Sequence, residues 1–129
     1  MSINRGRSWT WFANYKGQAG QWAQLLHRIT GLGVIFFLLL HVIDTAVLSW
    51  GPAAYDALAN FWHQPFFRVL QVGLLGSLLF HAINGIRVTI IDFSDWGTLN
   101  QEGLFWGVLV LFLLLFIPGA YLMVVPLFR

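Results

Sequence analysis

The sequence contains no cysteine and few charged residues, and both absences restrict what the chain can do. Without cysteine there are no disulfides within this chain and no thiolate ligands for an iron–sulfur cluster. Charged residues make up 9% of the sequence, where soluble domains have about 25%, and hydrophobic residues make up 58%. The net charge is +2 without a lysine-rich patch, so nothing indicates nucleic-acid binding. This composition indicates a membrane protein.

Three long apolar runs occupy most of the chain, at residues 29–50, 66–91 and 104–127. Each exceeds the ~20 residues that a helix needs to cross the hydrocarbon core of a bilayer. Helices satisfy their own backbone hydrogen bonds in lipid. We therefore expect an all-α membrane protein, a single membrane-anchor domain over residues 1–129. Its transmembrane helices should lie at about residues 25–50, 66–92 and 103–127, with loops at about 51–65 and 92–103.

The positively charged residues indicate how the chain is oriented. They divide between the two sides of the predicted bundle as Arg5, Arg7, Lys16, Arg28 and Arg87 on one side, and Arg68 and Arg129 on the other. Positive residues favour the cytoplasmic side of a membrane. We therefore expect a cytoplasmic N-terminus in a multi-pass protein of the cytoplasmic membrane of a prokaryote.

Ionisable residues within apolar runs are costly in lipid and mark functional positions. His27 and Arg28 open the first run, His41 lies deeper in it, and His81 and Arg87 lie near the end of the second. A neutral imidazole inside a helix bundle can ligate haem iron. An arginine at the water end of the same helix can pair with a haem propionate. The alternative for His41 is a hydrogen bond between helices.

Small residues surround His81 at helical spacing. Gly73 and Ser77 precede it by two turns and one turn, and Gly85 follows by one turn. Such a stripe can form a close contact between two membrane helices. It can also clear the helix surface for a flat macrocycle beside its ligand. We favour the second interpretation because the histidine lies within the stripe.

The depths of the histidines suggest more than one haem. If Arg28 and Arg87 both mark the cytoplasmic interface, His81 lies about 9 Å inside it and His41 about 20 Å inside it. Two axial ligands of one iron lie at nearly the same depth, so His41 and His81 should not share an iron. Each would need a ligand from another chain, which indicates a second anchor subunit with its own histidines.

Two motifs resemble the cytochrome b membrane-anchor subunit of succinate:quinone oxidoreductase (succinate dehydrogenase, respiratory complex II). Residues 27–30 read His-Arg-Ile-Thr, which is similar to that family's His-Arg-x-Ser/Thr. Residues 81–87, together with Asp92, are similar to its His-x3-Gly-Ile-Arg…Asp. The resemblance extends from about residue 20 to residue 93, and the third apolar run fits the family's layout.

The resemblance implies a haem b ligated by His81 and opposed by a histidine of a second membrane-anchor subunit. Members with two haems have a further histidine at the position of His41, which would ligate the second haem iron. Arg87 would lie near the haem propionates. The soluble partners would be a flavoprotein subunit with FAD and an iron–sulfur subunit with Fe–S clusters. Electrons from succinate would pass through them to quinone.

The resemblance also places His27 and Arg28 near the propionates and the quinone. The family usually has serine three residues before this histidine, where this chain has Gln24, which can still donate a hydrogen bond. Trp22 could line the quinone entry or be an interface aromatic. The alternative for Arg28 is a topological anchor reaching the headgroups.

Three other functions remain open from the sequence. One is the anchor of a quinol:fumarate reductase, which runs the same chemistry in reverse with a low-potential quinone. Another is a haem-free structural membrane anchor whose histidines are packing residues. The third is a small transporter or channel protein that uses Asp44 and the histidines for protons, although the chain lacks a repeated set of broken helices.

Overall fold

The computed structural model describes residues 19–128, which form helices joined by short turns. Three helices are long and apolar enough to cross a membrane: α1 (Ala19–Val47), α3 (Pro65–Phe93) and α5 (Gln101–Val124). Short 3₁₀ segments extend two of them, η2 (Leu48–Trp50) after α1 and η3 (Val125–Leu127) after α5. The prediction of an all-α membrane protein with three transmembrane helices is confirmed.

The two connections are helical, so the prediction of loops at about 51–65 and 92–103 is wrong for most of their length. The first contains α2 (Pro52–Trp62), and the second contains α4 (Asp95–Leu99). The prolines that break one helix also start the next: Pro52 and Pro65 occupy the first turn of α2 and α3. Gly51, with a φ of 101°, makes the turn between α1 and α2.

Helix α1 begins at Ala19, before the expected start near residue 25. The added residues 19–24 include Gln21 and Gln24, so the helix continues beyond the apolar run. Four charged residues used to predict the orientation lie outside the described residues: Arg5, Arg7, Lys16 and Arg129. The cytoplasmic position of the N-terminus therefore stays a prediction. Below, the end of the bundle that carries α4 is called the inner end, and the end that carries α2 the outer end.

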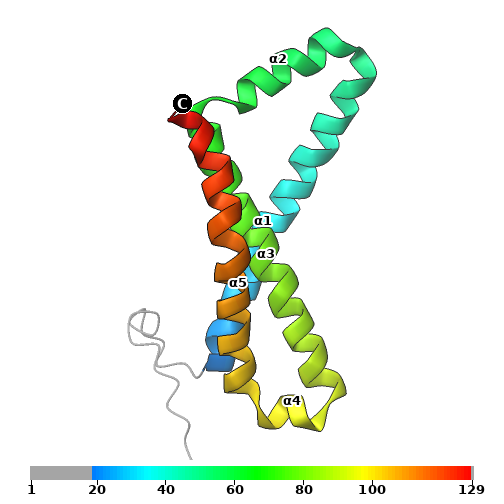
Figure 1. The fold of residues 1–129 in the computed structure, drawn as a ribbon. Coiled ribbons are helices and arrows are strands. Elements are labelled where there is room, and N and C mark those ends of the chain that lie inside the picture. The colour runs from blue at the N-terminus through cyan, green and yellow to red at the C-terminus, as the bar shows by residue number, and fades with distance from the viewer. Residues whose placement is uncertain (1–18, 129) are drawn as a thin grey trace, which may run out of the picture.

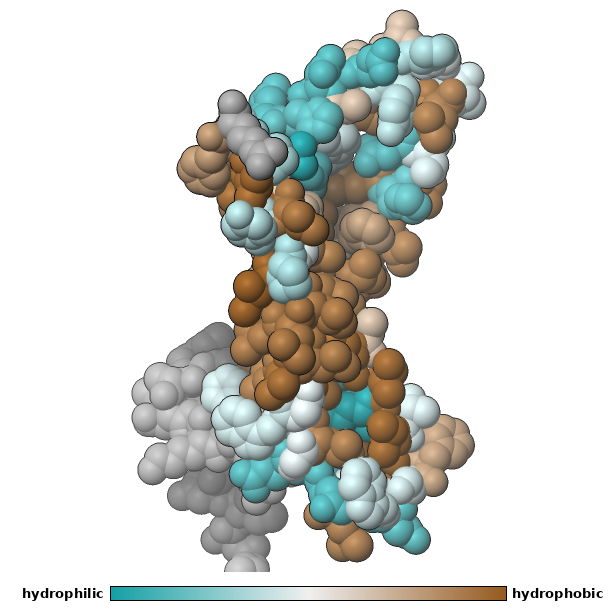
Figure 2. All heavy atoms as spheres, in the orientation of Figure 1, coloured by the Kyte–Doolittle hydropathy of each residue, from teal (hydrophilic) through white to brown (hydrophobic). Residues whose placement is uncertain are grey.

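Helix α1 crosses α3 near its middle, and α5 packs along α3 (Figure 1). The core at this junction contains Phe80 and Ile83 of α3 and Val108 of α5. Beyond the crossing, the outer half of α1 diverges from α3, and α2 joins their outer ends (Figure 1). Hydrophobic side chains form a band around the middle of the molecule, with hydrophilic residues toward both ends (Figure 2).

Small residues allow the close approach of α1 and α3. A Cβ added to Gly33 would lie 2.6 Å from Ser77 Oγ and 2.7 Å from Ser77 Cβ. One added to Gly85 would lie 3.8 Å from His27 Cε1, while Gly73 has open space around it. Ser77 therefore takes part in the close packing of α1 and α3 within this chain, and the interpretation of the stripe as clearance for a macrocycle stays a prediction.

Candidate functional site

Four polar side chains lie between α1 and α3 in the inner half of the bundle. They are His27 of α1 and His81, Asn84 and Arg87 of α3, and we call them the inner seam. The three residues of α3 follow one another at intervals of three, so they share one helix face. That face is turned toward α1 and the start of α5, where Asn84 is fully buried and Arg87 is 5% exposed. Polar groups at this degree of burial need hydrogen-bond partners.

His27 and His81 stack face to face. Their ring centroids are 3.9 Å apart and the rings are inclined by 8°. This spacing leaves no room for a macrocycle between them, so the two rings cannot be the two axial ligands of one iron in this arrangement. Nδ1 of His27 is buried without a hydrogen-bond partner in residues 19–128.

The hydrogen bonds of His81 define its tautomer. Its Nδ1 lies 3.1 Å from the backbone oxygen of His27 and 3.5 Å from Oγ1 of Thr30. A backbone carbonyl accepts and never donates, so Nδ1 carries the proton and Nε2 keeps its lone pair. Nε2 makes no hydrogen bond to any residue that the structure describes. The lone pair of Nε2 is therefore available to bind a metal.

Asn84 and Arg87 each keep a buried atom without a partner. Nδ2 of Asn84 donates a long hydrogen bond of 3.5 Å to the backbone oxygen of Ala23, whereas Oδ1 has no donor within residues 19–128. Nη2 of Arg87 donates to the backbone oxygen of Gln101 over 3.3 Å, and Nε is buried and unpartnered in the described chain. With Nδ1 of His27, the inner seam holds three buried polar atoms that a further group could satisfy.

Arg87 also lines a cavity of about 320 Å³ at the inner end. Gln21 and Gln24 of α1, Asp92 of α3 and Gln101 of α5 contribute polar walls. This size is near the lower limit for sites that hold small organic molecules. The cavity offers amide and guanidinium donors and one carboxylate, so it can bind a ligand with hydrogen-bond acceptors.

The structure brings some of the predicted site residues together and not others. Gln24 and Arg87 share the inner cavity, while Arg28 and Trp22 do not line it. Trp22 is 41% exposed. Arg28 is exposed and makes no hydrogen bond or ion pair that involves a described residue. It lies one turn after Gln24, so the two residues share a face of α1.

The assumption that Arg28 and Arg87 lie at the same depth is wrong. Arg87 is level with Gly20, whose added Cβ would lie 3.9 Å from Arg87 Nη2. Arg28 directly follows His27, which stacks on His81, so its backbone lies level with His81. That level is about 9 Å from Arg87 along the helix. The assumption failed because α1 continues past Arg28 toward the inner end. The pairing of α1 with α3 therefore places Arg28 deeper in the bundle than Arg87.

His41 lies on the outer half of α1, away from the inner seam. It is exposed and stacks on Phe37, with ring centroids 5.7 Å apart. The hydroxyl of Thr45 donates to the backbone oxygen of His41 over 2.8 Å, so it does not bind the imidazole. His41 follows His27 by fourteen residues, which is about 21 Å along the helix. Since His27 is level with His81, the separation in depth exceeds the expected 11 Å.

Two residues of the site were not predicted to act there. Asn84 lies between His81 and Arg87 at helical spacing, and this spacing could have indicated that Asn84 is buried beside them. Gln101 meets Arg87 across two helices, and no local pattern indicates this contact. Within residues 19–128, no three His, Cys, Asp or Glu side chains are grouped as a metal site. A haem, which takes its iron ligands singly from each face, does not need such a group.

The sequence matches the family described as succinate dehydrogenase/fumarate reductase transmembrane subunit over residues 5–117. It is 40% identical over 106 residues to succinate dehydrogenase 2 membrane subunit SdhC of Mycobacterium tuberculosis, covering 82% of this chain and 78% of that protein.

Two archaeal relatives are similar to this chain over comparable lengths. A succinate dehydrogenase hydrophobic membrane anchor subunit of Halobacterium salinarum is 33% identical, covering 80% of this chain and 75% of the relative. A protein of the same description from Archaeoglobus fulgidus is 31% identical, covering 78% and 86%.

Proposed function

Because this chain belongs to the family of succinate dehydrogenase/fumarate reductase transmembrane subunits, and is a membrane anchor subunit of succinate dehydrogenase, we propose that it binds haem b through His81 and forms part of a quinone site. It would tether a flavoprotein subunit with FAD and an iron–sulfur subunit with Fe–S clusters. Electrons from succinate oxidation would leave the complex on quinone, which takes up two electrons and two protons to become quinol.

The observation that carries the haem proposal is the hydrogen bond from His81 Nδ1 to the His27 carbonyl. Metal-binding histidines typically donate their second ring nitrogen to such a carbonyl, which fixes the tautomer and makes the other nitrogen more basic. The orphaned atoms nearby suit the same group, because a propionate could accept from Arg87 Nε. When bound, haem b supplies one-electron transfer chemistry.

Replacement of His81 tests this assignment. In the purified complex, His81→Leu should lose or perturb the inner haem b and weaken assembly, because this chain would no longer supply the imidazole that holds the haem. His63→Leu, at the exposed turn between α2 and α3, is the matched control and should leave the haem spectrum unchanged. A normal low-spin haem spectrum and haem content in His81→Leu would refute the assignment of His81 as a ligand, whereas a wild-type complex without a haem spectrum would leave a haem-free structural anchor.

The quinone site is proposed along the face of α1 that carries Gln24 and Arg28, continuing into the inner cavity. Gln24 and Arg87 line the cavity and can donate hydrogen bonds to a quinone carbonyl. Arg28, exposed one turn deeper, can stabilise negative charge on the quinone oxygen during reduction, or pair with a propionate. Trp22 would flank the entry rather than bind the quinone ring.

Arg28→Leu separates a role at the quinone from a role in assembly. It should strongly reduce quinone reductase activity, while succinate oxidation with a soluble dye acceptor is retained. Arg28→Lys keeps the charge without the planar guanidinium and should give an intermediate quinone reductase activity. Equal loss of both activities in an intact complex would count against the quinone-side role.

A second haem is proposed at His41, opposed, like the haem at His81, by a histidine of a second anchor subunit. The support is the exposure of His41 on the outer half of α1 and its distance from the His81 level, about 21 Å along the helix. A single iron cannot bridge that separation. The assembly would reside in the cytoplasmic membrane of a prokaryote, with the inner end of this chain facing the soluble subunits.

A further inference from the structure

The outer end holds a second cavity, which neither the haem nor the quinone proposal uses. Its volume is about 280 Å³, and it lies beneath α2, enclosed also by the outer ends of α1 and α3. Its charged or titratable lining residues are Asp44 of α1, Tyr55 of α2, His63 after α2, and Arg68 of α3. Ala59 of α2 forms part of the apolar wall.

Asp44 and Arg68 carry opposite charges and line the same cavity, yet they form no ion pair with each other or with any residue from 19 to 128. The carboxylate of Asp44 accepts one hydrogen bond, from Nε1 of Trp62 over 3.0 Å. Nε of Arg68 is buried and has no partner in the described chain. Partly buried charges of both signs that do not meet are costly unless another group neutralises each of them.

The position of the cavity indicates which molecules can reach it. It lies where the three spans end on the outer side, and hydrophilic residues cover this end beyond the hydrophobic band (Figure 2). Trp62 lines it, and Trp50 is 76% exposed nearby at the end of the first span. Tryptophans at the ends of spans mark the level of the lipid headgroups.

We propose that this cavity binds the headgroup of a zwitterionic phospholipid, phosphatidylethanolamine, with the phosphate on Arg68 and the ammonium on Asp44. Guanidinium groups bind phosphate through charge-assisted hydrogen bonds, and an ammonium group has three donors for a carboxylate. The volume suits a headgroup without its acyl chains. Those chains would lie along the apolar side chains that share the face of α1 with Asp44, including Leu40 and Phe37, which precede it by one and two turns.

Other occupants match the charges less well. An anionic lipid such as phosphatidylglycerol offers a phosphate to Arg68 and nothing positive to Asp44. Phosphatidylcholine carries a positive charge without an N–H donor, so it cannot hydrogen-bond the carboxylate. A quinone ring has acceptors and no charge, so it would leave Asp44 uncompensated. The inference is independent of haem and quinone binding.

The test is lipid retention by the whole purified complex. The complex is washed with detergent, equilibrated with equal amounts of phosphatidylethanolamine, phosphatidylcholine and phosphatidylglycerol with identical acyl chains, and measured by native mass spectrometry. The wild type should retain phosphatidylethanolamine preferentially. Arg68→Gln and Asp44→Asn should each lose that lipid, because the headgroup needs both charges.

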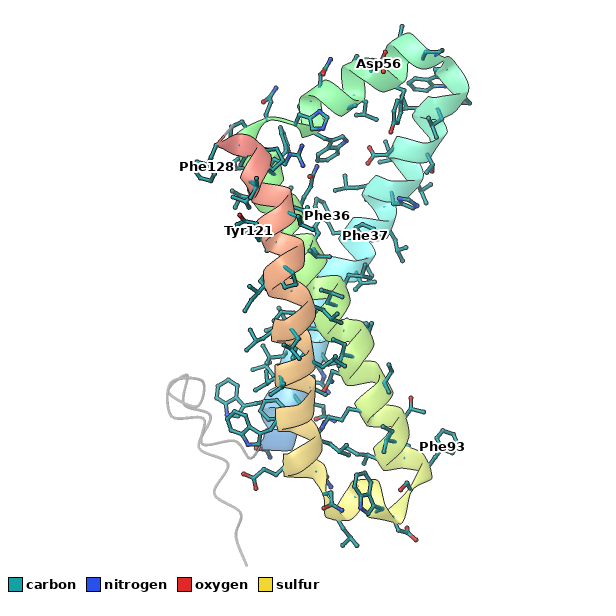
Figure 3. The ribbon with its side chains drawn as sticks, viewed as in Figure 1. Phe36, Phe37, Asp56, Phe93, Tyr121 and Phe128 are labelled. Carbon is teal, nitrogen blue, oxygen red and sulfur yellow. The ribbon has the colours of Figure 1, made fainter. Side chains whose placement is uncertain are left out.

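Two further variants separate lipid binding from folding. Ala59→Leu fills the cavity without removing a charge and should also lose the lipid. Asp56→Asn removes a carboxylate from the exposed surface of α2, outside the cavity, and should retain it (Figure 3). Four results would overturn the proposal: equal retention of all three lipids, retention of phosphatidylglycerol that depends on Arg68 and not on Asp44, unchanged retention in Ala59→Leu, or no lipid retained by the wild type.

Discussion

The inner and outer halves of this chain are built in different ways. In the inner half α1 lies against α3 from the inner end as far as the contact between Gly33 and Ser77, and polar side chains meet between the two helices. In the outer half α1 diverges, its apolar side chains are exposed, with Ile35 at 65%, and α2 joins the two helices across the end (Figure 1). The chain therefore forms the inner seam from its own helices, while His41 in the outer half faces away from them.

This difference bears on how a cofactor would be held. At the inner seam, His81 is oriented by the backbone oxygen of its neighbour on α1, so this chain alone fixes the ring. In the outer half, His41 contacts Phe37 of its own helix and is otherwise exposed. A ligand at His41 would depend on the second anchor subunit for its remaining surroundings.

Gly33→Leu should have the largest effect, because it separates the helices that form the inner seam. Even the Cβ atom would lie 2.7 Å from Ser77 Cβ, so the backbones must move apart. Overpacking of this kind costs about 1–3 kcal/mol or more. We expect little assembled complex on blue-native electrophoresis. Gly73→Leu adds the same side chain where nothing lies within 4 Å and should assemble nearly normally. Equal loss of assembled complex in Gly33→Leu and Gly73→Leu would contradict the claim that close packing of α1 on α3 is confined to the inner half.

Asn84→Leu should have an intermediate effect. If the assembled complex supplies the donor that Oδ1 lacks, removing this buried amide should lower the stability of the complex by about 1–3 kcal/mol. Thr45→Val in the outer half removes a hydroxyl that bonds carbonyls of its own helix and should change stability little. The thermal midpoint of the complex measures both. A more stable Asn84→Leu complex would mean that Oδ1 remains unpaired in the native assembly.

Thr30→Val should have the smallest effect, on the haem potential rather than on haem content. Its hydroxyl lies 3.5 Å from His81 Nδ1 and 3.1 Å from the carbonyl that Nδ1 bonds. The hydroxyl donates to that carbonyl and lies near the Nδ1 proton, so its removal changes the strength of the Nδ1 hydrogen bond and with it the basicity of the imidazole and the haem potential. Thr30→Ser keeps the hydroxyl and should keep the potential. Redox titration of the complex measures the shift, and an unchanged potential in Thr30→Val would contradict this coupling.

The sequence was sufficient for the features that depend on local patterns. Hydropathy predicted the three spans and placed His81 and Arg87 on the same helix. The family resemblance, carried by residues 27–30 and 81–92, is confirmed by the match to the succinate dehydrogenase/fumarate reductase transmembrane subunits. The prolines at 52 and 65 each lie in the first turn of a helix, so they start a helix as well as interrupt the preceding one.

The contacts between helices could not be predicted, because register depends on how whole surfaces pack. The stacking of His27 on His81 and the bond from Arg87 to Gln101 each join segments far apart in the sequence. The depth of Arg28 depends on the same register between α1 and α3, so the assumption that this arginine marks the interface gave the wrong depth. The haem, the quinone and the partners in the complex stay predictions.

The haem content per copy of this chain tests whether each half of the molecule holds one haem b, as proposed for His81 in the inner half and His41 in the outer half. A pyridine haemochrome assay against the protein mass of the purified complex gives the ratio. We expect two haems per chain in the wild type and one in His41→Leu, with the inner haem retained. A ratio of one haem per chain, unchanged by His41→Leu, would contradict this expectation and make His41 a helix-packing residue.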